Sequence, residues 1–358
     1  MEEILLALAA AVMTPAEADI VFAGDAMQHI AQIEAAKRSD GSYDYSGYFD
    51  SVASYVSAAD YAVVNLETPL GGKPYSGYPC FCAPDSYAEE LKKAGFDLFL
   101  TANNHTLDRR HKGLIRTVSV LDSLGVDHVG TYPDAESRNK ALPVIKDING
   151  FKVGFLNYTY GTNGIPVTGD VVVDYIDKET IRRDIEATRA AGAELIAVCM
   201  HWGAEYVMLP VKSQCELADF LTDLGVDMII GGHPHVIQPM EIRRSEKFDK
   251  NIFLCYSLGN YISNMKRRDT RGGAMARVIL QRDSLGRARV KDAKYSLVFT
   301  EPPSASNKNF RLVLPEKCNS VWKQQCAAFE KSAMQIFDKH NISVPRETAE
   351  ESSRRKTD

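Results

Sequence analysis

The chain has 358 residues, of which 45% are hydrophobic, and it carries a formal net charge of -5 with a pI near 6.0. This apolar content can build one large α/β unit or two domains, and the lack of a basic excess argues against nucleic acid as a partner. The longest apolar run, residues 4–13, is too short to span a bilayer, so we expect no membrane-spanning segment.

The first 18 residues leave two interpretations open. The apolar run 4–13 precedes Ala16-Glu17-Ala18, which resembles the cleavage site of a secretory signal peptide. Glu2 and Glu3, however, give an acidic start where signal peptides are basic, so an ordinary N-terminal helix is the alternative. We expect export to the periplasm or the cell surface, with a mature chain beginning near Asp19, and keep a cytoplasmic location as the alternative.

Four junctions predict repeated helix–strand units. Gly95, Gly125, Gly192 and Gly225 each end a helical pattern and precede an apolar run that contains an acidic residue near its start. The helices are expected at residues 85–94, 114–124, 178–191 and 211–224. Alternating helices and covered strands indicate the α/β class.

The pattern changes beyond residue 250. Segments 251–256, 274–281 and 288–299 resemble strands, with a turn at 283–286, and predict an antiparallel second layer. Residues 157–174 are expected to form a long loop beside the site. We therefore expect a main domain over 19–300, a peripheral extension over 301–345 with a helix near 319–340, and a disordered tail over 346–358.

Metal-binding side chains follow five apolar runs. They are Asp25 after 20–24, Glu67 after 62–66, Asn104 after 98–100, His201 after 195–200, and the pair His233 and His235 after 226–230. The carboxyl ends of parallel strands share one edge of a sheet, so these side chains are expected to converge. Carboxylate, amide and imidazole ligands suit Mn, Zn or Fe, and a carboxylate between two such ions would bridge them for a hydrolytic reaction.

These motifs together resemble a known family. The stretches are Gly24-Asp25-Ala26-Met27, Asn65-Leu66-Glu67-Thr68, the run from Ala102 to Asp108, His201-Trp202-Gly203-Ala204-Glu205-Tyr206, Gly232-His233-Pro234-His235 and Tyr256-Ser257-Leu258-Gly259-Asn260. Over about residues 19–299 the chain is similar to CapA-type capsule synthesis proteins. These are associated with poly-γ-glutamate production and resemble the calcineurin-like metallophosphoesterase superfamily.

The resemblance implies a four-layer α/β/β/α sandwich with a dinuclear metal site. It places Glu67 as the bridging ligand, with Asn104, His201 and His233 on one ion and Asp25 and His235 on the other. His105 would contact the scissile group and act as general acid, a role that its titration range permits.

One departure from the superfamily pattern concerns the second ion. Metallophosphoesterases usually open with Asp-x-His, whereas this chain has Asp25-Ala26-Met27. The ion bound by Asp25 and His235 therefore loses an expected imidazole, and His29 lies too far along the chain to replace it with certainty. Three alternatives therefore stay open: the site binds two ions, it binds one ion, or it is a degenerate site used for recognition.

Several neighbouring residues are expected to support this site. Asn65, Asn103, Asp108 and Glu205 are candidates for orienting the metal ligands or contacting substrate, and Arg109 for binding an anionic group. The expected function is a metal-dependent hydrolase of capsule or poly-γ-glutamate biosynthesis that acts on an anionic polymer or a phosphoester. The alternative is a non-catalytic, polymer-binding component of a capsule synthesis or export complex, with other capsule synthesis subunits as partners.

Overall fold

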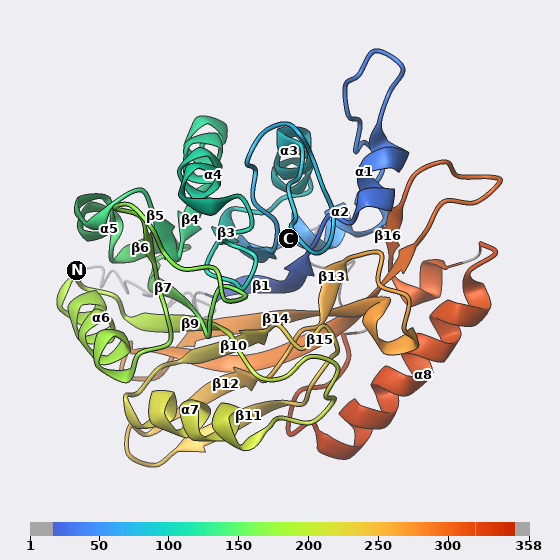
Figure 1. Cartoon of the computed structure of the whole chain (residues 1–358). Coiled ribbons are helices and arrows are strands. Elements are labelled where there is room, and N and C mark those ends of the chain that lie inside the picture. Colours follow the sequence, from blue (N-terminus) through green and yellow to red (C-terminus); the bar gives the residue numbers. More distant parts are fainter. Residues whose placement is uncertain (1–16, 319, 348–358) are drawn as a thin grey trace, which may run out of the picture.

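The computed structural model describes residues 17–318 and 320–347, and two β-sheets form its centre (Figure 1). The first, eight-stranded sheet has the order β16 (Arg311–Val313), β15 (Ala288–Glu301), β14 (Gly272–Arg282), β1 (Glu17–Ala26), β2 (Tyr61–Leu66), β3 (Leu98–Leu100) and β4 (Asp127–Val129), with β13 (Asn260–Ile262) paired to β1. Strands β1 to β4 are parallel, whereas the pairs β1–β14, β14–β15 and β15–β16 are antiparallel.

The second sheet has six strands and is parallel at its centre. Its order is β11 (Met240–Ser245), β12 (Lys250–Cys255), β10 (Met228–Gly232), β9 (Leu195–His201), β7 (Phe151–Thr159) and β6 (Val144–Ile148). The edge strands β11 and β6 pair antiparallel with their neighbours, and the others run parallel. A separate two-stranded sheet joins β5 (Thr131–Tyr132) to β8 (Val172–Val173).

Helices cover the outer faces of both sheets (Figure 1). The α-helices are α1 (Ile30–Ala36), α2 (Asp50–Val56), α3 (Asp85–Lys93), α4 (Arg110–Leu124), α5 (Ala135–Ala141), α6 (Lys178–Ala190), α7 (Lys212–Asp223) and α8 (Lys323–His340), with short 3-10 turns at Arg268–Thr270 and Pro315–Lys317. Helices α2, α3 and α4 pack on the first sheet, and α6 and α7 pack on the second.

Apolar side chains on both faces of the central strands explain why the two sheets stack. On β1, Ile20 and Phe22 join a buried cluster with Phe155 of β7 in the second sheet, whereas Val21 and Ala23 belong to the cluster beneath the helices. Successive side chains of a strand point to opposite faces, so each central strand is buried on both sides. Each large apolar side chain buried in this way contributes about 1.5–3 kcal/mol to folding.

The predicted helices form close to their expected bounds, and the glycine junctions end them as expected. Gly125 has φ 63° and ends α4, with its N–H directed at the carbonyls of Leu121 and Asp122. This left-handed conformation costs glycine little, which is why the residue marks the helix end in the sequence. The chain is a mixed α/β protein with a C-terminal helix.

Two predictions for the middle of the chain are wrong in detail. The strands β14 and β15 do not form a second layer: they extend the first sheet, whereas β12 enters the second sheet parallel to β10. The loop predicted over 157–174 begins only after β7 ends at Thr159, and β8 interrupts it. Strand pairing over long sequence separations decides both points, and periodicity does not encode it.

The C-terminal region is integrated into the fold more closely than expected. Strand β16 is an edge strand of the first sheet, and Phe329, Ala333 and Phe337 of α8 join the core cluster between the sheets. The described chain continues to Glu347, two residues into the predicted tail, and the rest of that tail lies outside the described residues. At the other end β1 begins at Glu17, and the predicted signal segment up to residue 16 also lies outside them.

Within residues 17–318 and 320–347, no helix combines the length and the apolar character that a membrane crossing requires. All seven cysteines are free thiols.

Candidate metal centre

The strand ends of the two sheets meet at one edge and bring the predicted metal ligands together. Asp25 lies near the end of β1, Glu67 follows β2, His201 ends β9 and His233 follows β10. The backbone N–H of His233 donates to Oδ2 of Asp25 at 3.2 Å, which ties the turn after β10 to β1 across the two sheets. The ends of parallel strands are where α/β proteins collect their ligands, and here two sheets contribute at once.

The turn from Gly231 to His235 has a special backbone. A side chain at Gly231 would place its Cβ 1.9 Å from the carbonyl oxygen of Tyr256, so only glycine fits there. His233 and His235 both adopt positive φ, 97° and 57°, a conformation that non-glycine residues rarely take. Such strain concentrates at functional sites, and here it aims two imidazoles into one cluster.

Two sets of donor atoms lie within a few tenths of an ångström of the spacing that one ion each would need. Glu67, His201 and His233 form the first set, and Asp25, Glu67 and His235 form the second, with the atoms of each set within 4.8 Å of one another. Two ligands of one ion lie up to about 4.4 Å apart when each bond is about 2.0–2.2 Å long. Glu67 is common to both sets, as expected of a bridging carboxylate.

The predicted amide ligand also lies in place. Oδ1 of Asn104 is 3.0 Å from Nε2 of His201, and Nδ2 of Asn104 donates to Oδ1 of Asn163 at 3.3 Å. The second contact holds the amide so that its oxygen faces the first donor set. That set therefore has four protein donors.

Glu67 carries the strongest sign that a cation belongs here. It is 0% exposed, and neither carboxylate oxygen has a hydrogen-bond partner. Burial and then the nearby Asp25 carboxylate raise its pKa well above the usual value. A buried carboxylate without donors is costly, and a divalent ion between the two donor sets would stabilise its charged form. The residues present thus fit a metal.

The environments of Asp25, His201 and His233 favour the protonation states that metal binding requires. Burial opposes ionisation of Asp25, but contacts with His235, His201 and Asn65 outweigh it and lower its pKa to about 2. Burial lowers the pKa of His233 to about 3 and that of His201 well below its usual range. Neutral imidazoles and an ionised aspartate are the forms that coordinate divalent ions.

Two predicted supporting asparagines orient the cluster. Nδ2 of Asn65 donates to Oδ1 of Asp25 at 2.8 Å. Asn103 donates from Nδ2 to the carbonyl of Leu66 at 2.9 Å and to Oδ1 of Asn65 at 3.2 Å. These bonds hold the loop after β3 against the end of β2, and such outer contacts fix ligand orientation in metal sites.

His105 is held by a carboxylate beside the cluster. Its Nδ1 lies 2.7 Å from Oδ2 of Asp108, which also accepts from the backbone N–H of Phe81 at 2.7 Å. The ring of Phe81 packs edge-on against His105, with 4.6 Å between ring centroids. When Nδ1 carries the proton donated to Asp108, Nε2 is the nitrogen available for acid–base chemistry.

Three further residues lie elsewhere than in the donor sets. The aliphatic part of the Arg109 side chain packs beside Gly71. His29 accepts at Nδ1 from the backbone N–H of Asn264 at 3.2 Å and packs edge-on against Phe81. Met27 is buried where the superfamily pattern has histidine.

The sequence analysis gave no individual role to three residues that shape the site. Oδ1 of Asn260 is 3.0 Å from Nδ1 of His235, which leaves Nε2 of that ring for a metal. Asn157 accepts from the N–H of Ala102 at 2.7 Å and so positions the loop that carries the predicted ligand Asn104. Tyr160, 48% exposed, lies 4.5 Å from His233 between ring centroids. All three follow or end apolar runs, the same signal that identified the ligands.

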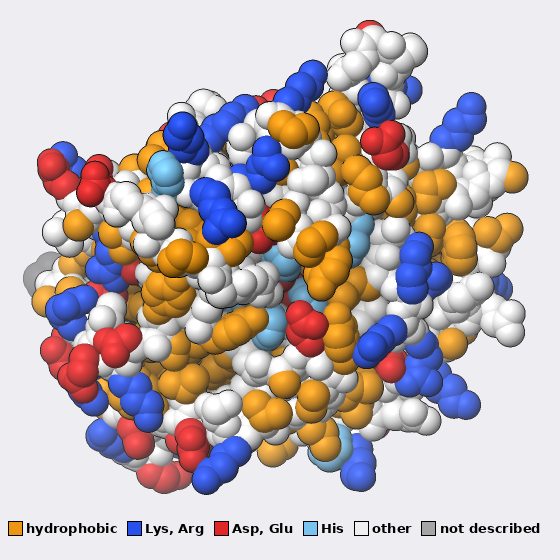
Figure 2. Space-filling model, in the orientation of Figure 1, with side chains coloured by type: hydrophobic (Ala, Val, Ile, Leu, Met, Phe, Trp, Pro, Cys, Tyr) orange, Lys and Arg blue, Asp and Glu red, His pale blue; other side chains and the backbone are white. Residues whose placement is uncertain are grey.

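The cluster opens on one face of the molecule (Figure 2). There, histidine side chains lie at the centre with an acidic side chain beside them, and lysine and arginine side chains lie further out. At this opening the guanidinium of Arg267 stacks on Tyr206, 4.2 Å from the ring centroid, and the ring of Tyr206 is 6.3 Å from that of His235. No ion pair joins Arg267 to a carboxylate among residues 17–318 and 320–347.

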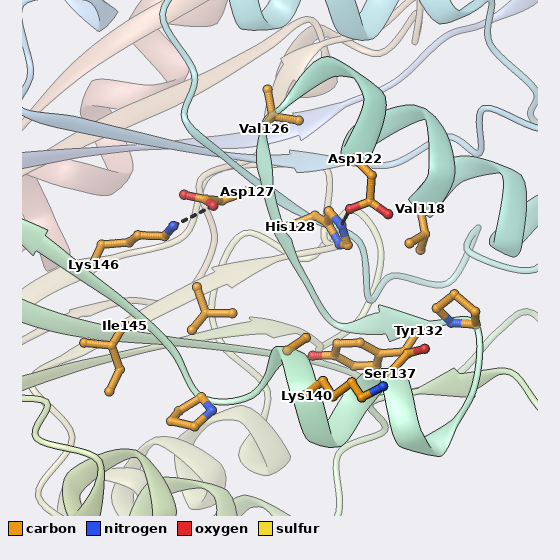
Figure 3. A pocket seen from close by; sticks show the side chains of 14 residues that line it. Val118, Asp122, Val126, Asp127, His128, Tyr132, Ser137, Lys140, Ile145 and Lys146 are labelled. Atoms are coloured by element: carbon orange, nitrogen blue, oxygen red, sulfur yellow. Dashed lines mark hydrogen bonds and ion pairs between the residues drawn. The ribbon is translucent and has the colours of Figure 1, made fainter.

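A separate hollow of about 570 Å³ lies between α4, β4, α5 and β6 and contains none of the metal ligands (Figure 3). Its charged groups already have ion-pair partners. Nε2 of His128 is 3.0 Å from Asp122, and Nζ of Lys146 is 2.6 Å from Asp127 (Figure 3). The chemistry therefore concentrates at the strand ends.

Comparison with known proteins identifies the family of this chain. Residues 19–265 match the family model described as "Bacterial capsule synthesis protein PGA_cap". The chain belongs to this family. It is 26% identical over 250 residues to the capsule biosynthesis protein CapA of Bacillus anthracis, covering 65% of this chain and 57% of that relative. It is also 26% identical over 322 residues to the PGA biosynthesis protein CapA of Bacillus subtilis (strain 168), covering 84% of this chain and 79% of that one.

The fold is similar to that of metallophosphoesterase-type nucleotidases. The NAD nucleotidase NadN of Haemophilus influenzae superposes with a TM-score of 0.51 at 14% identity, covering 96% of this chain and 66% of that one. A putative 5'-nucleotidase from Staphylococcus aureus gives a TM-score of 0.52 at 13% identity, covering 88% and 58%. At such identities the likeness concerns the fold alone.

Proposed function

We propose that this chain is a metal-dependent hydrolase of poly-γ-glutamate capsule biosynthesis, built as a four-layer metallophosphoesterase-type sandwich. The observation that carries the proposal is Glu67, fully buried with both oxygens unpartnered between two sets of donors. The family membership supports the biosynthetic context. We further propose that the protein acts outside the cytoplasm and with other capsule synthesis subunits.

The bound group would be one or two divalent ions of Mn, Zn or Fe, held by Asp25, Glu67, Asn104, His201, His233 and His235. Such ions supply Lewis acidity and a water of lowered pKa. His105, oriented by Asp108, would then protonate the leaving group through Nε2. Tyr160 and Tyr206 line the opening, and Arg267 above Tyr206 is suited to an anionic group of the substrate.

The test combines metal analysis with turnover. Protein loaded with Mn²⁺ is assayed on a phosphodiester and on poly-γ-glutamate, beside the His233→Ala/His235→Ala double variant and a metal-free sample. We expect bound metal and turnover in the wild type, and neither in the variant. Bound metal and polymer binding without any turnover would favour the non-catalytic, polymer-binding role instead, and absence of bound metal would overturn the proposal.

A further inference from the structure

Glu205 lies at the opening of the metal centre and faces two of its histidines. A carboxylate oxygen of Glu205 and ring nitrogens of His233 and His235 all lie within 4.8 Å of one another. In contrast to the buried ligands, Glu205 itself is exposed. It therefore approaches the cluster from the solvent side, whereas Asp25 and Glu67 approach from the sheets.

The backbone fixes this position. Glu205 lies in the loop after β9, and the next residue, Tyr206, has φ 65°, a strained conformation for an aromatic residue. The N–H of Tyr206 donates to the carbonyl of Pro234 at 2.8 Å, between the two histidines of the facing turn. The loop that carries Glu205 is thus attached to the turn that carries His233 and His235. This hydrogen bond restricts where Glu205 can lie, in contrast to an exposed glutamate on a loop without such an attachment.

The two donor sets differ in their number of protein donors. The set of Glu67, His201 and His233 has Asn104 as a fourth protein donor, because its Oδ1 lies 3.0 Å from Nε2 of His201. The set of Asp25, Glu67 and His235 has only three, and within the described part of the chain His29 does not belong to any such donor set. The second set is therefore one protein donor short of the first.

We propose that Glu205 is the missing donor and binds the ion held by Asp25, Glu67 and His235, because His235 belongs both to this set and to the group that Glu205 forms with His233 and His235. This inference rests on the proposed function only in that it requires metal to bind. Glu205 would contribute a carboxylate oxygen at the position where the expected imidazole is absent. Three carboxylates around this ion form a harder ligand set than two carboxylates and a further imidazole. Such a set favours Mn²⁺ over Zn²⁺, whereas an imidazole in its place would shift the preference toward Zn²⁺.

The experiment measures metal content and affinity, independently of activity. Wild type, Glu205→Gln, Glu205→His and the control Glu216→Gln are stripped with chelator, loaded with Mn²⁺ or Zn²⁺, dialysed and analysed for metal per chain, with titration calorimetry for affinity. Glu216 on α7 is exposed and pairs with Lys212, so its substitution changes charge equally without approaching the site. Thermal unfolding of each metal-free variant checks that all of them fold alike.

We expect two Mn²⁺ ions per chain in the wild type and in Glu216→Gln. In Glu205→Gln one ion is lost or its affinity falls about 100-fold, since even outer contacts alter metal affinity by about 10- to 100-fold. Glu205→His regains the second ion, with Zn²⁺ now preferred to Mn²⁺. Unchanged Mn²⁺ content and affinity in Glu205→Gln would overturn the inference and leave the proposed function standing. A wild type that binds neither Mn²⁺ nor Zn²⁺ would overturn both.

Discussion

Replacing Glu67 by glutamine should change the stability of the metal-free protein little but remove the stabilisation that metal gives. In the metal-free fold Glu67 is buried beside Asp25 without hydrogen-bond donors, and this environment raises its pKa and favours its protonated form. Glutamine has the shape of a protonated glutamate and adds N–H donors that neighbouring acceptors can use. We therefore expect the free energy of unfolding of metal-free Glu67→Gln to lie within about 1 kcal/mol of the wild type.

With metal present, the wild type should gain stability that Glu67→Gln cannot. A ligand at 100 times its dissociation constant stabilises the native state by about 2.7 kcal/mol. For a chain of this size that corresponds to a rise in Tm of about 4 °C. Thermal unfolding with chelator and with Mn²⁺ measures both quantities in one series. The reasoning would be refuted if Glu67→Gln kept the full rise in Tm, or if its metal-free form unfolded well below the wild type.

The same carboxylate sets the pH dependence of metal binding. Coordination needs ionised Glu67, so below its raised pKa each binding event at this residue must release a proton. Affinity for Mn²⁺ should therefore rise with pH until that pKa is passed and then level off. His233, with a pKa lowered to about 3, releases no proton near neutral pH. Calorimetric titrations in buffers of different ionisation enthalpy count the protons, and a count of zero would contradict this assignment of Glu67.

Three further changes test other parts of the molecule. Arg277→Ala removes a guanidinium, 1% exposed, that pairs with Asp19 and Glu347; it should lower the free energy of unfolding in urea by about 3–5 kcal/mol. Asp108→Asn weakens the orientation of His105 and should reduce phosphodiester turnover about 100-fold while metal content stays unchanged; loss of metal would instead indicate a structural role. Arg267→Ala should weaken binding of poly-γ-glutamate about 5-fold at low salt and less at high salt, whereas equal binding would remove this residue from substrate recognition.

The candidate metal ligands were predictable from sequence because each one lies at, or shortly after, the end of a buried strand. Periodicity and glycine positions locate the ends of those strands, and the carboxyl ends of parallel strands converge by geometry. Asp25, Glu67, Asn104, His201, His233 and His235 satisfied this rule, and the structure brings all of them to one edge. The assignment of Arg109 to an anionic group stays a prediction, because sequence proximity to a motif does not determine where a long side chain points.

Sequence alone thus determined the helices, the strand ends and the chemical character of the donor set, since these depend on local pattern and residue type. Tertiary structure alone decided that β14 and β15 extend the first sheet, that α8 packs into the core, and that Asn260 orients His235. It also decided that Glu205 faces His233 and His235. Those outcomes depend on contacts between segments far apart along the chain, which are set by the packing of the two sheets and leave no periodic trace in the sequence.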